Sequence, residues 1–200
     1  MNPLRLAIAP LFALLLAVPA GAEPLSLADL SAYLNGLRTA EADFTQLNAD
    51  GSRSTGKLYI VRPGRARFEY APPENTLVLA SGGQVAVIDG KSNQAPEQYP
   101  LKRTPLNLVL APNIDLARAS MVVGHGGDDT ATWVEAQDPE HPEYGSIMLV
   151  FTPQPIELRQ WVIRDEGGNE TTVLLDKLTT GGTYSQFLFE IPRRTGGNDN

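Results

Sequence analysis

Hydrophobic residues recur at helical spacing near the start of the chain. Four leucines follow one another at intervals of three and four, which places them on one face of a helix: Leu27, Leu30, Leu34 and Leu37. Ser26 precedes this stripe, and its hydroxyl can cap the helix while Asp29 closes a capping box. The pattern predicts an amphipathic helix that begins at Ser26 and lies on an apolar surface.

From Glu41 onward the hydrophobic period changes to two, which is typical of β-strands. Turn sequences such as Arg62-Pro63-Gly64 and Ser81-Gly82-Gly83 separate the alternating stretches. Connections this short join antiparallel neighbours. The strands that we expect are residues 41–48, 56–61, 65–70, 76–80, 84–89, 120–124, 130–136, 146–152, 157–164, 170–179 and 186–191.

The expected fold class is therefore mainly β, with about eleven short antiparallel strands and two helices. The second helix follows Thr104-Pro105, covers residues 106–110 and ends before Ala111-Pro112. One sheet of this size must curl or close to remove its edges. The helices carry more apolar surface than their own contact could bury, so we expect both to cover the concave side of the sheet. Either side chains fill the remaining concavity, the commoner outcome in small barrels, or a ligand does.

Residues 1–22 have the pattern of a cleavable signal peptide. Arg5 supplies a positive charge, residues 6–18 are apolar, and Ala20-Gly21-Ala22 forms a cleavage site before Glu23. The apolar run is shorter than the roughly 20 residues that span a bilayer. We expect a soluble mature chain that begins at Glu23, with one domain over residues 23–192 and a polar tail over residues 193–200.

Composition and charge argue against several functions. The net charge is −7 and no basic run exists, so nucleic-acid binding lacks its electrostatic driving force. The absence of cysteine excludes a disulfide scaffold, a cysteine zinc site and a thiol nucleophile. An exported domain of this size without disulfides fits a bacterial periplasm.

Catalytic and metal-binding patterns are also missing. The two histidines, His125 and His141, lack the spacing of metal ligands, and no serine lies in a Gly-x-Ser-x-Gly elbow. A Ser-His-Asp triad has no support in the sequence, although sequence alone leaves it open. We expect a protein that is not an enzyme and that needs no metal or cofactor.

Residues 56–70 form the most informative segment. Alternate residues of a β-strand point to the same face of the sheet. One face of the first strand therefore carries Leu58, Ile60 and Arg62, and one face of the second carries Ala66, Phe68 and Tyr70. If this face is the concave one, Arg62 is a charged group at the edge of an apolar surface, and helix carbonyls could be its acceptors. The alternative is that Arg62 precedes a turn and points to solvent.

A series of short segments runs in a fixed order through nearly the whole mature chain. They are Phe44-Thr45-Gln46, residues 56–60, Arg62-Pro63-Gly64-Arg65, Phe68-Glu69-Tyr70, Pro100-Leu101, Thr104-Pro105-Leu106, and residues 149–151, 165–168, 170–172 and 187–192. This series resembles the periplasmic outer-membrane lipoprotein carrier family. The order of the segments together with the export signal carries the resemblance.

The resemblance implies an open, unclosed antiparallel β-barrel whose apolar concavity is lidded by helices and takes up the acyl chains of lipoproteins. It implies that Arg62 is a lid latch, which holds the lid closed through hydrogen bonds to the backbone of residues 106–110. It also implies a carrier that takes lipoproteins from an inner-membrane releasing transporter and gives them to an outer-membrane acceptor. Separately, we expect the mature protein to be a monomer. The residues expected to bind acyl chains are Leu58, Ile60, Phe68, Tyr70, Leu106 and Val109.

Other functions fit the same sequence less well. The second hypothesis is a periplasmic lipid-binding or envelope-sensing module on the same fold. A small outer-membrane barrel or a hydrolase comes third. Charged residues break the apolar faces at mid-strand and argue against a membrane barrel: Arg67, Glu69, Arg159 and Asp176.

Overall fold

The computed structural model describes residues 23–92, 94–118 and 120–192. The expected signal peptide and polar tail, residues 1–22 and 193–200, lie outside the described residues. The elements are α1 (Leu27–Gly36), β1 (Thr39–Leu47), β2 (Arg53–Val61), β3 (Arg65–Tyr70), β4 (Thr76–Ser81), β5 (Gln84–Asp89), β6 (Glu97–Pro100), η1 (Leu101–Arg103), α2 (Leu106–Leu110), β7 (Val122–Gly127), β8 (Thr132–Gln137), η2 (Pro142–Tyr144), β9 (Ser146–Pro153), β10 (Ile156–Arg164), β11 (Glu170–Leu175), β12 (Thr179–Thr180) and η3 (Gln186–Phe189).

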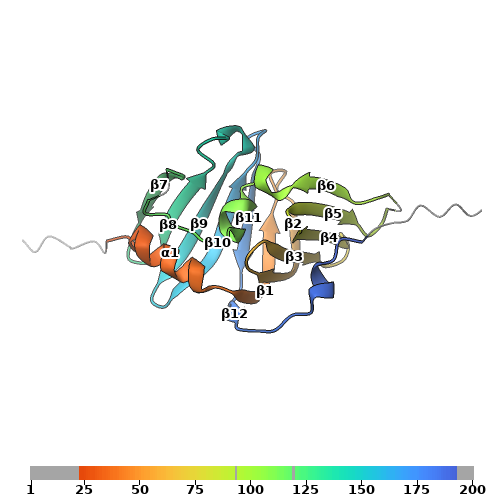
Figure 1. The fold of residues 1–200 in the computed structure, drawn as a ribbon, viewed down its shortest axis with the longest axis horizontal. Helices are drawn as coiled ribbons and strands as arrows, with labels where there is room; N and C mark the ends of the chain where they lie inside the picture. The colour runs from red at the N-terminus through yellow and green to blue at the C-terminus, as the bar shows by residue number, and fades with distance from the viewer. Residues whose placement is uncertain (1–22, 93, 119, 193–200) are drawn as a thin grey trace, which may run out of the picture.

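One antiparallel sheet contains all the strands of the described residues (Figure 1). Eleven strands follow the order β6-β5-β4-β3-β2-β1-β11-β10-β9-β8-β7, and β12 pairs with β1 off this path. In the described part of the chain β6 and β7 end the path without pairing with each other, so the sheet is not closed. The expectation of a mainly β fold with an unclosed sheet is confirmed.

Helix α1 lies across the concave face of β8–β10 (Figure 1). The expected cap is present, since Ser26 Oγ accepts a hydrogen bond from the Asp29 backbone N at 3.1 Å. The Tyr33 ring packs edge-on against Phe151 of β9 at 5.8 Å, and its hydroxyl accepts a hydrogen bond from the Leu158 amide of β10 at 3.0 Å. Within the described residues, no helix is long and apolar enough to cross a membrane.

The C-terminal segment differs from the sequence prediction. Residues 186–191 are expected as a strand, but Gln186–Phe189 form the 3-10 helix η3. Ser185 Oγ caps this turn by accepting from the Phe187 amide at 3.3 Å. Phe187 and Phe189 would share one face of a strand, yet Phe187 is 78% exposed and Phe189 is 1% exposed. Phe187 and Phe189 thus occupy alternate positions in the sequence, but they lie on different sides of a helical turn.

The helix η3 covers the convex face of β3 and β4. Arg67 Nη1 donates a hydrogen bond to the Leu188 carbonyl at 2.8 Å, and the Arg65 guanidinium lies 5.7 Å from the centre of the Phe189 ring. Leu79 and Ala86 are also buried on this side, outside the main core. The C-terminal segment therefore gives the convex side its own small buried cluster.

Two further strand predictions differ from the structure. The expected strand 170–179 ends at Leu175, and Thr179–Thr180 form the separate short strand β12. Strand β6 (Glu97–Pro100) is absent from the prediction because its side chains do not alternate between apolar and polar. Its register with β5 runs from Gln84↔Pro100 to Val87↔Glu97, so β6 belongs to the sheet through backbone pairing at an edge.

Candidate functional site

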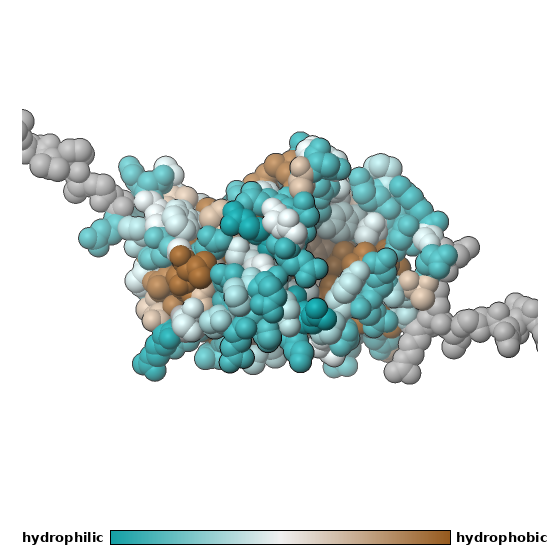
Figure 2. Space-filling model, turned by 90° about the horizontal axis from the view of Figure 1, so that it is seen from above, coloured by the Kyte–Doolittle hydropathy of each residue, from teal (hydrophilic) through white to brown (hydrophobic). Residues whose placement is uncertain are grey.

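A cavity of about 620 Å³ opens on the concave side of the sheet. Strands β3–β6 line one side, β10 and β11 line the other, and η1 with the start of α2 lies over it. Seen from above, hydrophobic surface forms the floor of a hollow between polar rims, in the half of the molecule that contains β4–β6 (Figure 2). The lining residues in these strands are mainly apolar: Phe68, Tyr70, Val78, Val85, Tyr99, Trp161, Ile163 and Val173.

The floor of the cavity depends on a glycine. Gly56 of β2 pairs with Phe44 of β1 on one side and Tyr70 of β3 on the other. A Cβ at Gly56 would lie 2.8 Å from the Phe44 ring and 2.2 Å from the Glu69 carbonyl oxygen. Because no side chain stands there, the Phe44 and Tyr70 rings meet edge-on with centroids 5.2 Å apart.

Tyr70 brings a polar group into this apolar surface without a charge. Its hydroxyl donates a hydrogen bond to Gln46 Oε1 at 2.6 Å. Burial raises the pKa of Tyr70 to about 12, although the hydrogen bond to Gln46 acts in the opposite direction. The phenol is therefore neutral at physiological pH, and the inner cavity suits an uncharged apolar ligand.

Charged residues gather at the mouth of the cavity. Arg103 of η1 lies with its guanidinium 5.4 Å from the centre of the Tyr144 ring, and both residues line the opening. Asp165 and Glu166, in the turn between β10 and β11, line it as well. Apolar groups inside and charged groups at the rim match a ligand with a long apolar part and a polar end.

The structure brings three of the six expected acyl-binding residues to the cavity: Phe68, Tyr70 and Leu106. Leu58 and Ile60 share the concave face with Phe68, as their strand parity predicts, but they are 0% and 3% exposed. Val109 of α2 is buried in the same core cluster. Leucines of α1 and α2 belong to that cluster too, so side chains fill this half of the concavity while the other half is hollow.

Several lining residues were missing from the sequence prediction. Trp161 and Ile163 alternate along β10, and Thr171 and Val173 alternate along β11. The same counting by two that identified Phe68 and Tyr70 could have identified these four. That prediction also requires the strand order, which places β10 and β11 across the concavity from β3 and which the sequence pattern does not give.

Arg62 lies directly after β2 and connects α1 to the residue that follows α2. Its Nη1 donates a hydrogen bond to the carbonyl of Leu34 in α1, and its Nη2 donates to the carbonyl of Ala111 at 2.6 Å. The resemblance implies acceptors within residues 106–110, whereas the structure uses the residue after α2 and a residue of α1. Gly64, two residues on, donates its amide to the Leu110 carbonyl at 2.9 Å.

The Arg62 charge is held by carbonyl groups alone. The side chain is 7% exposed, and it forms no ion pair within the described residues. Burial, together with the nearby charge of Arg38, lowers the pKa of Arg62. Leu34 is in the last turn of α1, where carbonyls carry partial negative charge. Its carbonyl also accepts a hydrogen bond from the Leu37 amide at 3.3 Å. The guanidinium thus caps the C-terminal end of α1 while it holds the segment after α2.

Further hydrogen bonds join α1 to the segment that follows α2. Asn35 makes two of them with the backbone of Ile114. Ser31 Oγ accepts a third from the Leu116 amide at 2.9 Å. We use the term lid for α1 together with residues 105–116, because these contacts make the two segments one unit over the concave face.

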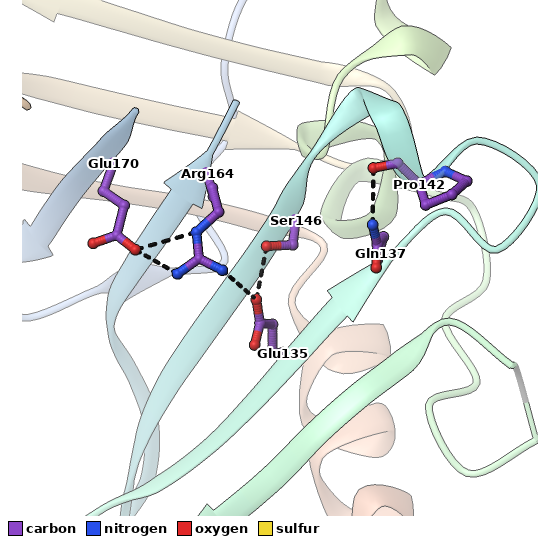
Figure 3. A network of polar contacts seen from close by, with 6 residues as sticks. All are labelled: Glu135, Gln137, Pro142, Ser146, Arg164 and Glu170. Atoms are coloured by element: carbon purple, nitrogen blue, oxygen red, sulfur yellow. Dashed lines mark hydrogen bonds and ion pairs between the residues drawn. The ribbon is translucent and has the colours of Figure 1, made fainter. Parts of the chain in front are cut away.

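A polar network on the convex face connects β8 to β11 (Figure 3). Arg164 Nη2 lies 2.5 Å from Glu170 Oε1, and Arg164 Nη1 lies 3.8 Å from Glu135 Oε1. Ser146 donates its hydroxyl to the same Glu135 oxygen at 2.8 Å. Exposed ion pairs contribute about 1 kcal/mol or less. The network therefore adds little to stability. It joins neighbouring strands of the sheet, and its residues do not line the cavity.

The chain is similar to known proteins in family model, in sequence and in structure. The family model described as outer membrane lipoprotein carrier protein LolA matches residues 35–192. An outer-membrane lipoprotein carrier protein from Methylococcus capsulatus is 27% identical over 175 residues, covering 84% of this chain and 83% of that protein. One from Chromohalobacter salexigens is 27% identical over 173 residues, covering 82% and 81%. Among solved structures, a LolA superfamily protein from Nitrosomonas europaea covers 83% of this chain and 98% of that chain, with 8% identity and a TM-score of 0.41.

Proposed function

The chain belongs to the outer membrane lipoprotein carrier (LolA) family, and we propose that it carries lipoproteins by holding their acyl chains in the cavity under the lid. The family is not enzymatic and is typically periplasmic. We further propose that the protein acts in the periplasm, after removal of residues 1–22, with no cofactor.

The apolar cavity of about 620 Å³ is the observation that supports this proposal best. Its volume lies in the range of roughly 300–1,000 Å³ that is usual for ligand sites. Transfer of an acyl chain from a membrane into water costs about 0.8 kcal/mol of free energy per CH₂. A chain of about fourteen methylenes therefore needs on the order of 10 kcal/mol of favourable contacts with a carrier before it can leave the membrane. Burial against Phe68, Val78 and Trp161 is the kind of contact that supplies it.

The lid makes such binding reversible. In the proposal, Arg62 is the latch that holds the closed state through its bonds to both lid segments. Displacement of the lid would uncover Leu58 and Ile60 and would expose Val109 of the lid itself. These residues would then extend the acyl-binding surface beyond Phe68, Tyr70 and Leu106. Closure of the lid competes with cargo, so the apparent affinity falls by the fraction of molecules in the closed state.

The proposed partners follow from the cargo. An inner-membrane transporter that releases lipoproteins would load the carrier as a monomer, and an outer-membrane acceptor would receive the cargo. In this scheme the carrier uses no nucleotide, so the transporter supplies the free energy for loading the cargo. Nucleic acid has no part in it.

Mass spectrometry of material that co-purifies from the periplasm tests this function. Acylated lipoprotein is the expected finding, whereas phospholipid alone would favour the lipid-binding alternative. Val78→Arg places a charge in the cavity lining, and Leu77→Arg places the same charge one residue away on the other face of β4. We expect Val78→Arg to lose the cargo and Leu77→Arg to keep it. Equal cargo in both variants would argue against binding in this cavity.

A further inference from the structure

Trp161 carries a polar group that the protein leaves unused. The side chain lines the cavity and is 1% exposed, and its indole Nε1 is buried without a hydrogen-bond acceptor anywhere in the described ranges. An indole N–H can only donate. Buried donors are nearly always paired, because an unpaired one has given up water and gained nothing. Phenylalanine is smaller but aromatic, and it would place no unpaired donor at this position.

The surroundings of Trp161 explain why no protein acceptor reaches it. Its ring packs edge-on against Phe68 at 6.1 Å, and its strand neighbours are Leu149 and Val173. The amide oxygen of Gln46, also in the lining, already accepts from Tyr70.

The acidic residues of the lining do not supply the missing acceptor. Asp165, at the mouth, accepts from the Gly167 and Asn169 amides of its own turn. Glu166 follows it in the same turn and is exposed. In the described part of the chain, none of these lining residues pairs with the Trp161 indole.

We propose that the indole N–H of Trp161 donates a hydrogen bond to the carbonyl oxygen of a bound acyl group, so that the cavity selects fatty acyl esters and amides over plain alkyl chains. This inference rests on the proposed function, because it names a group of the ligand that the acyl cavity holds. A hydrocarbon tail has no acceptor, whereas every ester- or amide-linked chain has a carbonyl at its polar end. Entry of that carbonyl would pair the indole in the loaded state only.

A matched pair of ligands isolates this bond. 1-Decanoylglycerol and 1-O-decylglycerol have the same chain length and the same glycerol end, and they differ by the carbonyl oxygen. We expect the wild-type protein to bind the ester more tightly by about 2- to 10-fold, the range of one hydrogen bond. Trp161→Phe should remove this preference.

The second tryptophan of the chain provides the control. Trp133 of β8 is 37% exposed on the convex face, so Trp133→Phe should keep the ester preference. This variant also leaves Trp161 as the only tryptophan. Its fluorescence should shift to longer wavelength with the ester and less with the ether. That measurement stands even if Trp161→Phe folds poorly.

Each outcome decides the inference. An equal ester preference in the wild type and Trp161→Phe would contradict it and leave the acyl cavity intact. Failure of the wild type to bind either ligand would contradict both this inference and the proposed function.

A synthetic diacylglyceryl-cysteine peptide and dioctanoylphosphatidylglycerol separate the two natural sources of the carbonyl, which are lipoprotein and membrane phospholipid. A loss of affinity in Trp161→Phe for the peptide alone assigns it to lipoproteins, a loss for the phospholipid alone assigns it to membrane lipid, and a loss for neither contradicts the inference.

Discussion

Asn35 and Ile114 are joined by two hydrogen bonds, although 79 positions separate them in the chain. The Asn35 Nδ2 donates to the Ile114 carbonyl at 2.7 Å, and its Oδ1 accepts from the Ile114 amide at 3.0 Å. The side-chain amide thereby satisfies both backbone groups of a residue that has no regular secondary structure. This pairing makes α1 and the segment after α2 respond together to any force that opens the lid.

Asn35→Ala should loosen the lid. Loss of the two bonds predicts a decrease in the free energy of unfolding of about 1–3 kcal/mol. Amide hydrogen exchange at Ile114 should become faster, because this amide loses its acceptor. Asn107→Ala in α2 is the control, since the Asn107 side chain makes no hydrogen bond within the described residues. Equal exchange rates at Ile114 in both variants would show that Asn35 does not hold the two segments together.

Gly56→Ala should disturb the cavity floor. The added Cβ would meet the Glu69 carbonyl oxygen at 2.2 Å, and a backbone atom in a sheet cannot move aside as the end of a side chain can. Overpacking of this kind costs about 1–3 kcal/mol. Thermal unfolding measures the effect, with Gly36→Ala as the control, because a Cβ at Gly36 has nothing within 4 Å. Equal melting temperatures in the two variants would mean that the sheet yields at Gly56.

Tyr70 predicts a loss of stability in alkaline solution. Its pKa is about 12 in the folded protein, because of burial, against an ordinary value of 10. A raised pKa means that folding favours the neutral phenol, so this contribution is complete below pH 10 and is lost as the pH rises from 10 to 12. Its size is at most about 3 kcal/mol. The melting temperature of the wild type should therefore fall more steeply over this pH range than that of Tyr70→Phe.

A matched tyrosine sharpens this pH experiment. Tyr99 also lines the cavity, but it is 48% exposed, and its pKa is raised mainly by a hydrogen bond to Glu97. Tyr99→Phe should keep the steep wild-type fall, since an exposed phenol gains little from folding. Parallel curves for the wild type and Tyr70→Phe would show that Tyr70 ionises without cost in the folded state.

Local patterns predicted the elements better than their arrangement. The Ser26 cap, the leucine stripe of α1 and the parity of Leu58 and Phe68 depend on neighbours within a few positions, and the structure has all three. η3 was mistaken for a strand because Phe187 and Phe189 alternate with other residues over a stretch too short to distinguish a period of two from a single helical turn.

The site was harder to predict because it depends on strand order. Counting by two finds a concave face on each strand, but it does not say which part of that face the helices fill. Leu58 and Ile60 share that face with Phe68, yet they pack in the filled half. The acceptors of Arg62 lie 28 and 49 positions away along the chain. Contacts that distant leave no periodic trace in the sequence.

Arg62→Leu should change the handover of cargo more than the fold. Hydrogen bonds from a charged donor contribute about 1.5–3 kcal/mol each, so their loss destabilises the closed lid. The substitution also removes a buried charge that has no ion partner, which offsets part of the loss in overall stability. The closed state no longer competes with cargo, so the variant should bind acylated lipoprotein more tightly and transfer less of it.

Two further variants separate the latch from a general effect of losing an arginine. Arg62→Lys keeps the charge, but a single ammonium cannot reproduce the fork that reaches Leu34 and Ala111 together, so its transfer should lie between those of the wild type and Arg62→Leu. Arg53→Leu removes an exposed arginine at the other end of β2 and should transfer normally. Retention and transfer of lipoprotein are measured side by side for all four proteins. Normal transfer by Arg62→Leu would remove the latch from the mechanism, and unfolding of that variant at ordinary temperature would assign Arg62 a structural role instead.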